Sequence, residues 1–271
     1  QAAAAEPVAA REVMVGEVVA AVAEQRSAWS RADVVQAICD LQQPASQLSG
    51  GGWAAAVEDA ADRVLAELVD LDPPGETMRR ASDGRSVWIE PTAAHFSTNV
   101  VLAQEEAIVT WAMAAQADPP TPSTTLRPDR LDAMQAAAAK AVAGEDRLVL
   151  VVGPAGVGKT RMLSAARHDL HYPGRVVAGL APTAKAARTL QRDTLIATDT
   201  VAKLLHEWLR PDRGPLPDYQ HPAGTTLVVD EAGLITTPDL HQLICLADLR
   251  RWRVVLVGDP HQLQGVGRSG M

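Results

Sequence analysis

Residues 148–160 read LVLVVGPAGVGKT, and this stretch decides the fold of the second half of the chain. Its first five residues are apolar and predict a buried strand, and the rest fits the phosphate-binding pattern GxxxxGK followed by Ser or Thr. That pattern covers Gly153, Pro154, Ala155, Gly156, Val157, Gly158, Lys159 and Thr160. Glycines let backbone N–H groups turn toward phosphate oxygens, and a helix that begins at the end of the loop adds partial positive charge. We therefore expect Lys159 to reach the β- and γ-phosphates of ATP and the Thr160 hydroxyl to ligate Mg²⁺.

Further apolar runs follow the phosphate-binding loop, and helical patterns separate them. The runs cover residues 176–180, 226–229 and 254–257. The helices are expected at residues 129–143, 160–170, 184–192, 201–209 and 238–249. Continuous apolar strands that alternate with helices are typical of a parallel sheet covered on both faces. The sequence therefore predicts an α/β domain of the P-loop NTPase class over residues 129–271.

Polar side chains follow two of these strands. Residues 227–232 read LVVDEA and bring Asp230 and Glu231 to the end of a strand, where ligands collect in open α/β sheets. We expect Asp230 to hold Mg²⁺ and Glu231 to polarise the attacking water as general base. A solvated loop end is the alternative, and the upstream loop favours the catalytic interpretation. Gln262 lies just beyond another strand, where an amide can hydrogen-bond the γ-phosphate or the attacking water.

The order of these motifs resembles that of superfamily 1 DNA helicases. GDPHQL at residues 258–263 resembles motif III, and DEAG at residues 230–233 resembles motif II. APTAKAA at residues 181–187 resembles motif Ia, and TDTVAKLL at residues 198–205 resembles the DNA-contacting segment that follows it. The resemblance implies that Gln135 reads adenine, although an exposed helix residue is the alternative. It implies single-stranded DNA contacts for Pro182, Thr183, Lys185 and Thr200. The alternative for Thr183 and Lys185 is that they only cap and solvate the start of a helix.

Within superfamily 1, the chain resembles the 5′→3′ branch. It is most similar to the helicase portion of conjugative relaxases of the TrwC/TraA type, and next to the alpha subunit of bacterial exonuclease V. Residues 95–111 and 265–271 favour the conjugative family. The resemblance implies the first of two RecA-like motor domains of an ATP-dependent 5′→3′ DNA helicase, with ATP bound in the cleft between them.

The second motor domain of such helicases supplies an arginine that stabilises charge on the γ-phosphate. The chain ends at Met271, ahead of those motifs, so we expect a motor fragment that binds Mg·ATP and single-stranded DNA but turns over slowly. Its missing partner would be the second RecA-like domain of the same parent. No nicking activity is assigned, because the tyrosines are Tyr172 and Tyr219, both in the motor half. A repair helicase of the exonuclease V type and a non-enzymatic P-loop switch module are the alternatives.

Residues 1–120 predict a separate, small helical or winged-helix domain. Helices are expected at residues 8–25, 31–41 after Ser30, and 53–69, with a break at residues 50–52. A strand is expected at residues 86–90, and a helix after Ser97 or Thr98. Four prolines in residues 118–128 are typical of a linker, so the domain boundary is placed there.

The charge is divided unevenly along the chain, whose formal net charge is −8. Residues 1–120 hold 7 Arg, no Lys and 18 acids, a charge of −11, while residues 121–271 carry +3. A helicase needs only a local basic groove, so the total does not exclude a nucleic-acid partner. The two cysteines match no metal or redox spacing. No apolar run is long enough to cross a bilayer and no signal peptide opens the chain, so a cytoplasmic protein is expected.

Overall fold

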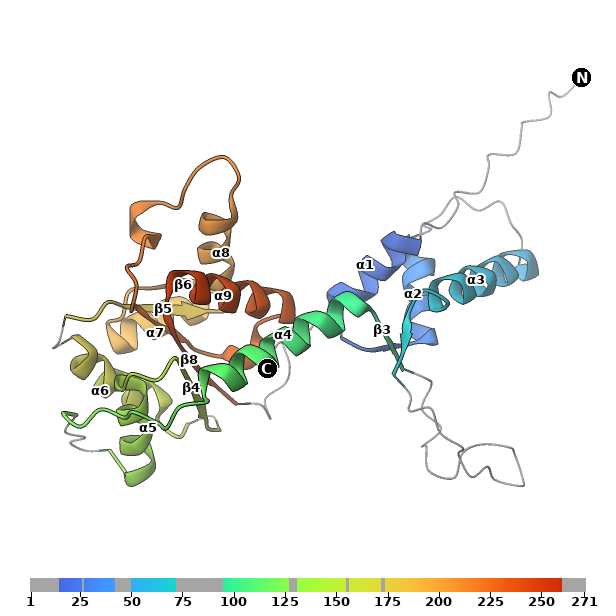
Figure 1. Ribbon diagram of the computed structural model, residues 1–271. Coiled ribbons are helices and arrows are strands. Elements are labelled where there is room, and N and C mark those ends of the chain that lie inside the picture. Colours follow the sequence, from blue (N-terminus) through green and yellow to red (C-terminus); the bar gives the residue numbers. More distant parts are fainter. Residues whose placement is uncertain are drawn as a thin grey trace, which may run out of the picture. The chain divides into compact units, whose positions relative to one another are not determined.

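The computed structural model describes residues 15–25, 27–41, 50–71, 95–126, 131–154, 156–171 and 174–259. The chain forms two compact units, residues 1–102 and residues 103–271, and the division falls within helix α4 (Asn99–Ala115) (Figure 1). Each unit has its own apolar core. Among the residues described, no helix is both long enough and apolar enough to span a membrane.

The described part of the first unit combines three helices with a small antiparallel sheet. Its elements in chain order are α1 (Val15–Gln25), β1 (Trp29–Ser30), α2 (Arg31–Leu41), α3 (Gly50–Leu65), β2 (Val69–Asp70) and β3 (His95–Ser97). The strands are ordered β1-β3-β2, and both pairs are antiparallel. This element order and strand order correspond to the winged-helix alternative. Its core holds Val18, Trp29, Ile38, Val64 and Val101. The strand expected at residues 86–90 lies outside the described residues.

Helix starts in this unit follow capping chemistry. The Ser30 backbone N–H donates to Asp33 Oδ2 at 2.7 Å, so the predicted start of α2 is confirmed. Thr98, rather than Ser97, caps α4, because its Oγ1 accepts the Val101 N–H at 3.1 Å. The predicted break at residues 50–52 is wrong, because α3 begins at Gly50. Gly50 has a φ of +36°, which glycine adopts readily, and the glycines meet no neighbouring atoms that would exclude the helix.

The second unit is built on a five-stranded parallel sheet, as predicted. Its strand order is β4-β8-β7-β5-β6, and every pair is parallel. The strands are β4 (Leu148–Val152), β5 (Val177–Ala181), β6 (Thr198–Thr200), β7 (Thr226–Val229) and β8 (Arg253–Gly258). β6 was not expected. Within the described sheet β4 lies at one end, and its Leu150 and Val152 side chains are 46% and 61% exposed.

Helices cover both faces of this sheet, and successive strand residues show it. Leu227 and Val229 belong to one core cluster, whereas Val228 between them belongs to the other. The first cluster includes residues of α8 (Val201–Leu209) and α9 (Thr237–Arg250), with Ile108 and Trp111 of α4 packed against it. The second includes residues of α5 (Ala133–Ala143), α6 (Lys159–His171) and α7 (Ala184–Thr194). The described residues of the unit also form two short 3-10 helices, η1 (Pro217–Tyr219) and η2 (Ala232–Leu234).

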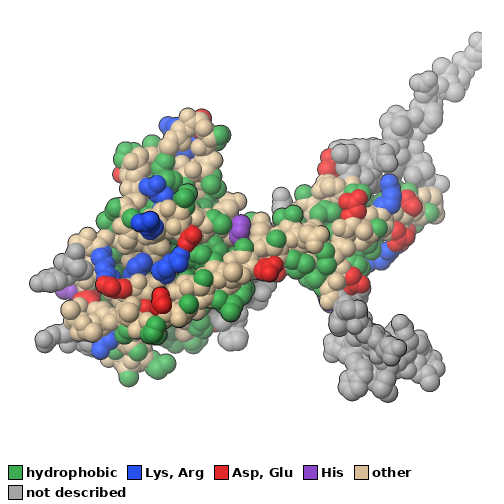
Figure 2. All heavy atoms as spheres, in the orientation of Figure 1, with side chains coloured by type: hydrophobic (Ala, Val, Ile, Leu, Met, Phe, Trp, Pro, Cys, Tyr) green, Lys and Arg blue, Asp and Glu red, His purple; other side chains and the backbone are tan. Residues whose placement is uncertain are grey.

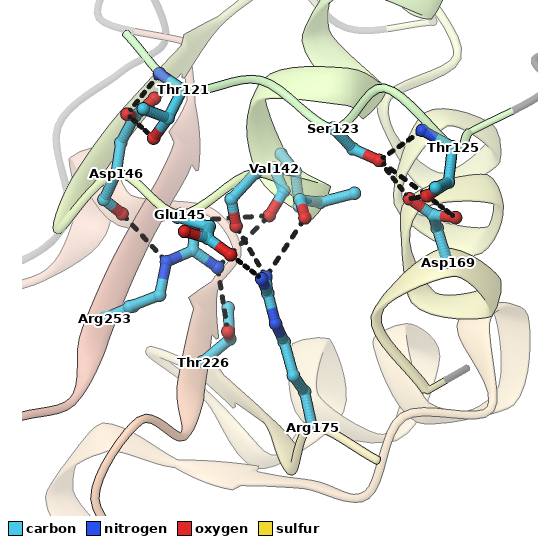
Figure 3. Close-up of polar contacts among 12 residues, drawn as sticks. Thr121, Ser123, Thr125, Val142, Glu145, Asp146, Asp169, Arg175, Thr226 and Arg253 are labelled. Atoms are coloured by element: carbon cyan, nitrogen blue, oxygen red, sulfur yellow. Dashed lines mark hydrogen bonds and ion pairs between the residues drawn. The ribbon is translucent and has the colours of Figure 1, made fainter. Parts of the chain in front are cut away.

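Part of the proline-rich stretch, residues 121–126, belongs to the second unit and lies against its helices α5 and α6, and we call these residues the strap (Figure 3). The Thr121 backbone N–H and hydroxyl both donate to Asp146 Oδ1 at 2.7 Å. The Ser123 backbone N–H donates to the Lys140 carbonyl at 2.8 Å. The Ser123 and Thr125 hydroxyls both donate to the carboxylate of Asp169 on α6. These bonds join the strap to α5, to the loop after α5 and to α6.

Two arginines donate hydrogen bonds to backbone carbonyls at and just after the C-terminal end of α5 (Figure 3). Arg175 donates to the Gly144 carbonyl at 2.6 Å and to the Ala143 carbonyl at 3.1 Å. Arg253 donates to the Asp146 carbonyl at 2.8 Å and to Thr226 Oγ1 at 3.0 Å. The Arg253 side chain is buried, and burial lowers its pKa to about 10, so it stays charged at neutral pH. The last carbonyls of a helix need such partners when water cannot reach them.

Charge is also unevenly spread over the surface. Figure 2 shows Lys and Arg side chains gathered on the presented face of the second unit, with Asp and Glu beside them. A chain with a formal net charge of −8 therefore carries local groups of positive charge on this face.

Candidate nucleotide-binding site

The glycine-rich loop connects β4 to α6 and ends at the helix N-terminus. Gly156 and Gly158 have φ angles of +81° and +82°, which side chains other than glycine rarely adopt. Lys159 is the first residue of α6, and its Nζ donates to the Gly153 carbonyl at 2.5 Å and to the Pro154 carbonyl at 3.3 Å. The ammonium group therefore lies within the loop itself. Ala155 lies outside the described residues.

Helix α5 contacts this loop through Gln135. The helix starts at Ala133 rather than at residue 129, because Asp132 forms a capping box with Gln135. The Gln135 N–H donates to Asp132 Oδ1 at 2.8 Å, and Gln135 Oε1 accepts the Asp132 N–H at 3.2 Å. Gln135 Nε2 donates to the Val157 carbonyl at 2.8 Å. A Cβ atom at Gly158 would lie 2.6 Å from Gln135 Nε2, so the helix and the loop are in close contact.

Asp230 and Glu231 follow β7 at the carboxyl edge of the sheet. The Asp230 N–H donates to the Leu180 carbonyl of the neighbouring strand at 2.9 Å. The Glu231 N–H donates to Asp230 Oδ1 at 3.0 Å. Glu231 has a φ of 52° and a ψ of 38°, in the left-handed region. Such a conformation costs a residue with a side chain about 1 kcal/mol, and residues of this kind cluster at functional sites.

These carboxylates share their surroundings with two lysines. Burial raises the pKa of Asp230, and Lys159 opposes the shift. Burial and the nearby Asp230 charge raise the pKa of Glu231, and Lys159 and Lys185 oppose that shift. Lys159 therefore acts on both carboxyls and Lys185 on Glu231, although the four residues come from three separate connections in the sequence.

The sequence of the second unit matches a known protein family. Residues 130–271, which include all of these groups, match the family described as AAA domain. This chain belongs to the AAA domain family. The family assignment makes the second unit a nucleotide-binding domain.

The chain is also similar to longer proteins. It is 34% identical to the conjugal transfer protein TraA of Rhizobium radiobacter over 204 residues, which cover 75% of this chain and 17% of that protein. It is 36% identical to a probable TraA of Sinorhizobium fredii over 140 residues, covering 52% of this chain and 12% of that protein. It is 32% identical to the multifunctional conjugation protein TraI of Escherichia coli K12 over 126 residues, or 45% and 7% of the two chains.

The match spans about a sixth of the length of the first of these relatives, 17%. The predicted relationship to superfamily 1 helicases of the TraA relaxase type is confirmed.

The residues predicted to contact DNA also lie at the carboxyl edge of the parallel sheet. Pro182 and Thr183 follow β5, and Thr200 ends β6. Thr183 Oγ1 accepts the Ala186 N–H at 3.1 Å, and Thr200 Oγ1 accepts the Lys203 N–H at 3.1 Å. Both hydroxyls thus cap helices, as the alternative for Thr183 had it, and a DNA contact remains a prediction.

Lys185 is exposed in the first turn of α7, where the helix dipole disfavours a positive side chain. Helix stability therefore does not explain a lysine at this position. Its positive charge instead favours the ionised form of Glu231, and it is available to a ligand.

Sequence reasoning did not foresee two features of the site. One is the brace from Gln135 to the loop, although the spacing of Asp132 and Gln135 is a capping-box signal. The other is the effect of Lys185 on Glu231, which links two motifs that are far apart in the sequence. Gln262 lies outside the described residues, so its predicted place beside the γ-phosphate stays a prediction.

Proposed function

We propose that this AAA domain is the first motor domain of an ATP-dependent 5′→3′ DNA helicase from a conjugative relaxase-helicase. The observation that carries the proposal is the grouping of Lys159, Asp230 and Glu231 at the carboxyl edge of the sheet, next to the glycine-rich loop. The similarity to conjugal transfer proteins supports a conjugative parent over a repair helicase of the exonuclease V type.

The side chains present fit Mg·ATP. The positive φ angles of Gly156 and Gly158 suit a loop whose N–H groups surround phosphate oxygens. Lys159 would bind the β- and γ-phosphates, and the Thr160 hydroxyl and Asp230 carboxylate would hold Mg²⁺ through oxygen, the ligand it prefers. When bound, Mg²⁺ would neutralise phosphate charge. Glu231 would take a proton from the attacking water, and Gln262 would orient that water.

Hydrolysis by this domain alone would be slow. Among the described residues, the cations that act on Asp230 and Glu231 are Lys159 and Lys185. In the proposed parent, a second RecA-like domain would add an arginine to the γ-phosphate, and such a group raises the rate by about three to five orders of magnitude. Fast ATP hydrolysis by this chain, stimulated by single-stranded DNA, would contradict the two-domain proposal.

Single-stranded DNA would lie beside the nucleotide, across the N-termini of α7 and α8. Their first N–H groups and the exposed Lys185 are suited to backbone phosphates. A P-loop switch module that binds a protein partner is the alternative, and it needs no such affinity.

A double variant, Thr183→Asn with Lys185→Ala, tests the DNA proposal. Asn still caps a helix, so α7 should persist. We expect the affinity for a single-stranded oligonucleotide to fall about tenfold at low salt, while Mg·ATP affinity stays within about twofold. Lys140→Ala, in the last turn of α5, is the matched control and should change neither. Equal DNA affinity in the wild type and the double variant would instead favour the switch module.

A further inference from the structure

Helix α7 carries a row of three basic side chains along its exposed face. Lys185, Arg188 and Arg192 are separated by three and then four residues, a spacing that places them on one side of an α-helix. All three are exposed, and at a rise of about 1.5 Å per residue the row is about 10 Å long. The opposite side of α7, which includes Ala187 and Leu190, is buried. The row is therefore accessible to a ligand along its whole length.

The protein itself neutralises little of this charge. Arg192 binds the carboxylate of the adjacent Asp193, with Nε to Oδ1 at 2.6 Å and NH2 to Oδ2 at 3.2 Å. Exposed ion pairs of this kind are weak, so a phosphate can compete with Asp193 for Arg192. Within the described residues, the side chains of Lys185 and Arg188 form no hydrogen bond or ion pair, although the charge of Lys185 acts on Glu231. Most of the positive charge of the row is thus left for a partner.

The C-terminal end of the row borders a hollow in the surface. The hollow has a volume of about 470 Å³ and is lined by Arg188, Gln191, Arg192, Leu195 and Ala197. Gln191 Oε1 accepts the Thr198 N–H at 3.3 Å, and the Nε2 group of the same amide is a hydrogen-bond donor. Leu195 is 69% exposed and has a φ of 60°, in the left-handed region. The hollow therefore combines cations, an amide donor and an apolar side chain.

This combination of side chains suits the backbone of a single nucleic-acid strand. Arginine, lysine and glutamine side chains commonly bind backbone phosphates, and these contacts carry no sequence information. Leu195 offers apolar surface to a sugar or a base. The row begins at Lys185, next to the proposed DNA contact at Thr183. A strand bound at the N-terminus of α7 therefore reaches the hollow by following the helix for about 10 Å.

We propose that Arg188, Gln191 and Arg192 form a second contact for single-stranded DNA, which extends the proposed DNA site along α7 to the hollow at its C-terminal end. The contact is made to backbone phosphates and is independent of base sequence. This inference rests on the proposed function, because it lengthens the DNA site named there. It requires the affinity for DNA to rise with oligonucleotide length until one strand covers both ends of α7.

The double variant Arg188→Gln with Arg192→Gln tests the inference. The probes are oligothymidylates of about 4 and about 16 nucleotides, which span the usual sizes of single-strand sites. We expect the affinity of the full chain for the longer probe to fall about tenfold at low salt. The slope of log K against log salt should become shallower by about 1.4, because each lost phosphate contact contributes about 0.7. The shorter probe fits the Thr183 end alone, so its affinity should change by less than about twofold, as should that for Mg·ATP.

Arg147→Gln with Arg251→Asn is the matched control. It also removes two exposed arginines, but these precede β4 and β8, away from α7. Asn at residue 251 tolerates the left-handed backbone of that position. The control should leave the affinity for the longer probe and its salt dependence unchanged.

Equal affinities and salt slopes for the longer probe in the wild type and the α7 double variant would overturn the inference and leave the proposed function standing. Equal losses in the α7 variant and the control would also overturn it, because net charge and not the row would then explain binding. Failure of the wild type to bind either probe would overturn the proposed DNA site itself.

Discussion

The two edges of the parallel sheet are built in opposite ways. At the amino edge, Arg175 and Arg253 bind carbonyls at the end of α5, and the strap adds further bonds (Figure 3). At the carboxyl edge, burial raises the pKa values of two carboxyls, Asp230 and Glu231. One edge satisfies its polar groups and stabilises the fold. The other keeps poorly solvated carboxyls where α/β sheets commonly bind their ligands.

The amino edge is where we expect the largest loss of stability. Arg253→Met keeps the apolar stem but leaves the Asp146 and Val142 carbonyls and the Thr226 hydroxyl without this donor. We expect the free energy of unfolding in urea to fall by about 3 kcal/mol. Arg188→Met, on the exposed surface of α7, is the control and should change it by less than about 0.5 kcal/mol. A loss below about 1 kcal/mol for Arg253→Met would refute the assignment of stability to this edge.

The carboxyl edge should show the converse. Lys159→Ala removes the ammonium group that would bind the phosphates, and we expect Mg·ATP affinity to fall about 100-fold, or about 2.7 kcal/mol. The urea midpoint without nucleotide should hardly move, because the lost bonds go to loop carbonyls. Isothermal titration and urea unfolding on the same preparations measure both quantities. A large destabilisation would show that the loop supports the fold.

Gly144 tests how closely the strap approaches α5. A Cβ atom at this residue would overlap the Thr121 carbonyl oxygen and lie 3.0 Å from Pro122 Cα. Both are backbone atoms, so the strap itself would have to move, and Gly144→Ala should cost about 2 kcal/mol. Gly214→Ala is the control, because nothing lies within 4 Å of its added Cβ. Equal stability of the two variants in urea would mean that the strap yields freely.

Asp230→Asn should give the smallest change in the free energy of unfolding, and it should raise that free energy rather than lower it. Burial raises the folded-state pKa of Asp230 above its ordinary value of 3.8, so the folded chain favours the neutral carboxyl. The wild type therefore loses stability as pH rises through 3.8 toward the raised pKa, and the neutral amide does not. We expect the metal-free variant to be about 1 kcal/mol more stable at pH 7, with the gain vanishing near pH 3. A variant less stable than the wild type at pH 7 would contradict the role of burial.

The regular parts of the second unit could be predicted because their patterns are local. The apolar runs at residues 148–152 and 226–229 are β4 and β7 with the predicted bounds, and the run at 254–257 is the interior of β8. β6 could not be predicted from the sequence, because its three residues, TDT, have no apolar pattern. It exists because it pairs with β5.

The candidate site was predictable in its motifs but not in its cross-connections. Nothing in RWRVVLV shows that Arg253, at the start of a strand, is buried against the end of α5. That contact joins residues 111 positions apart. The left-handed backbone conformation of Glu231 could not be predicted either, because the DE motif specifies which residues are present and not their dihedral angles.

The outer strand β4 has one further consequence. Its sequence LVLVV has the character of a strand sheltered on both sides, yet one flank of its backbone is open within the described sheet and carries neither charge nor proline. Any extended polypeptide that reached this flank would continue the ladder and cover Leu150 and Val152 without rearranging the layers behind it. We expect the same property to favour pairing of this flank with another extended chain, and Val152→Lys to oppose it.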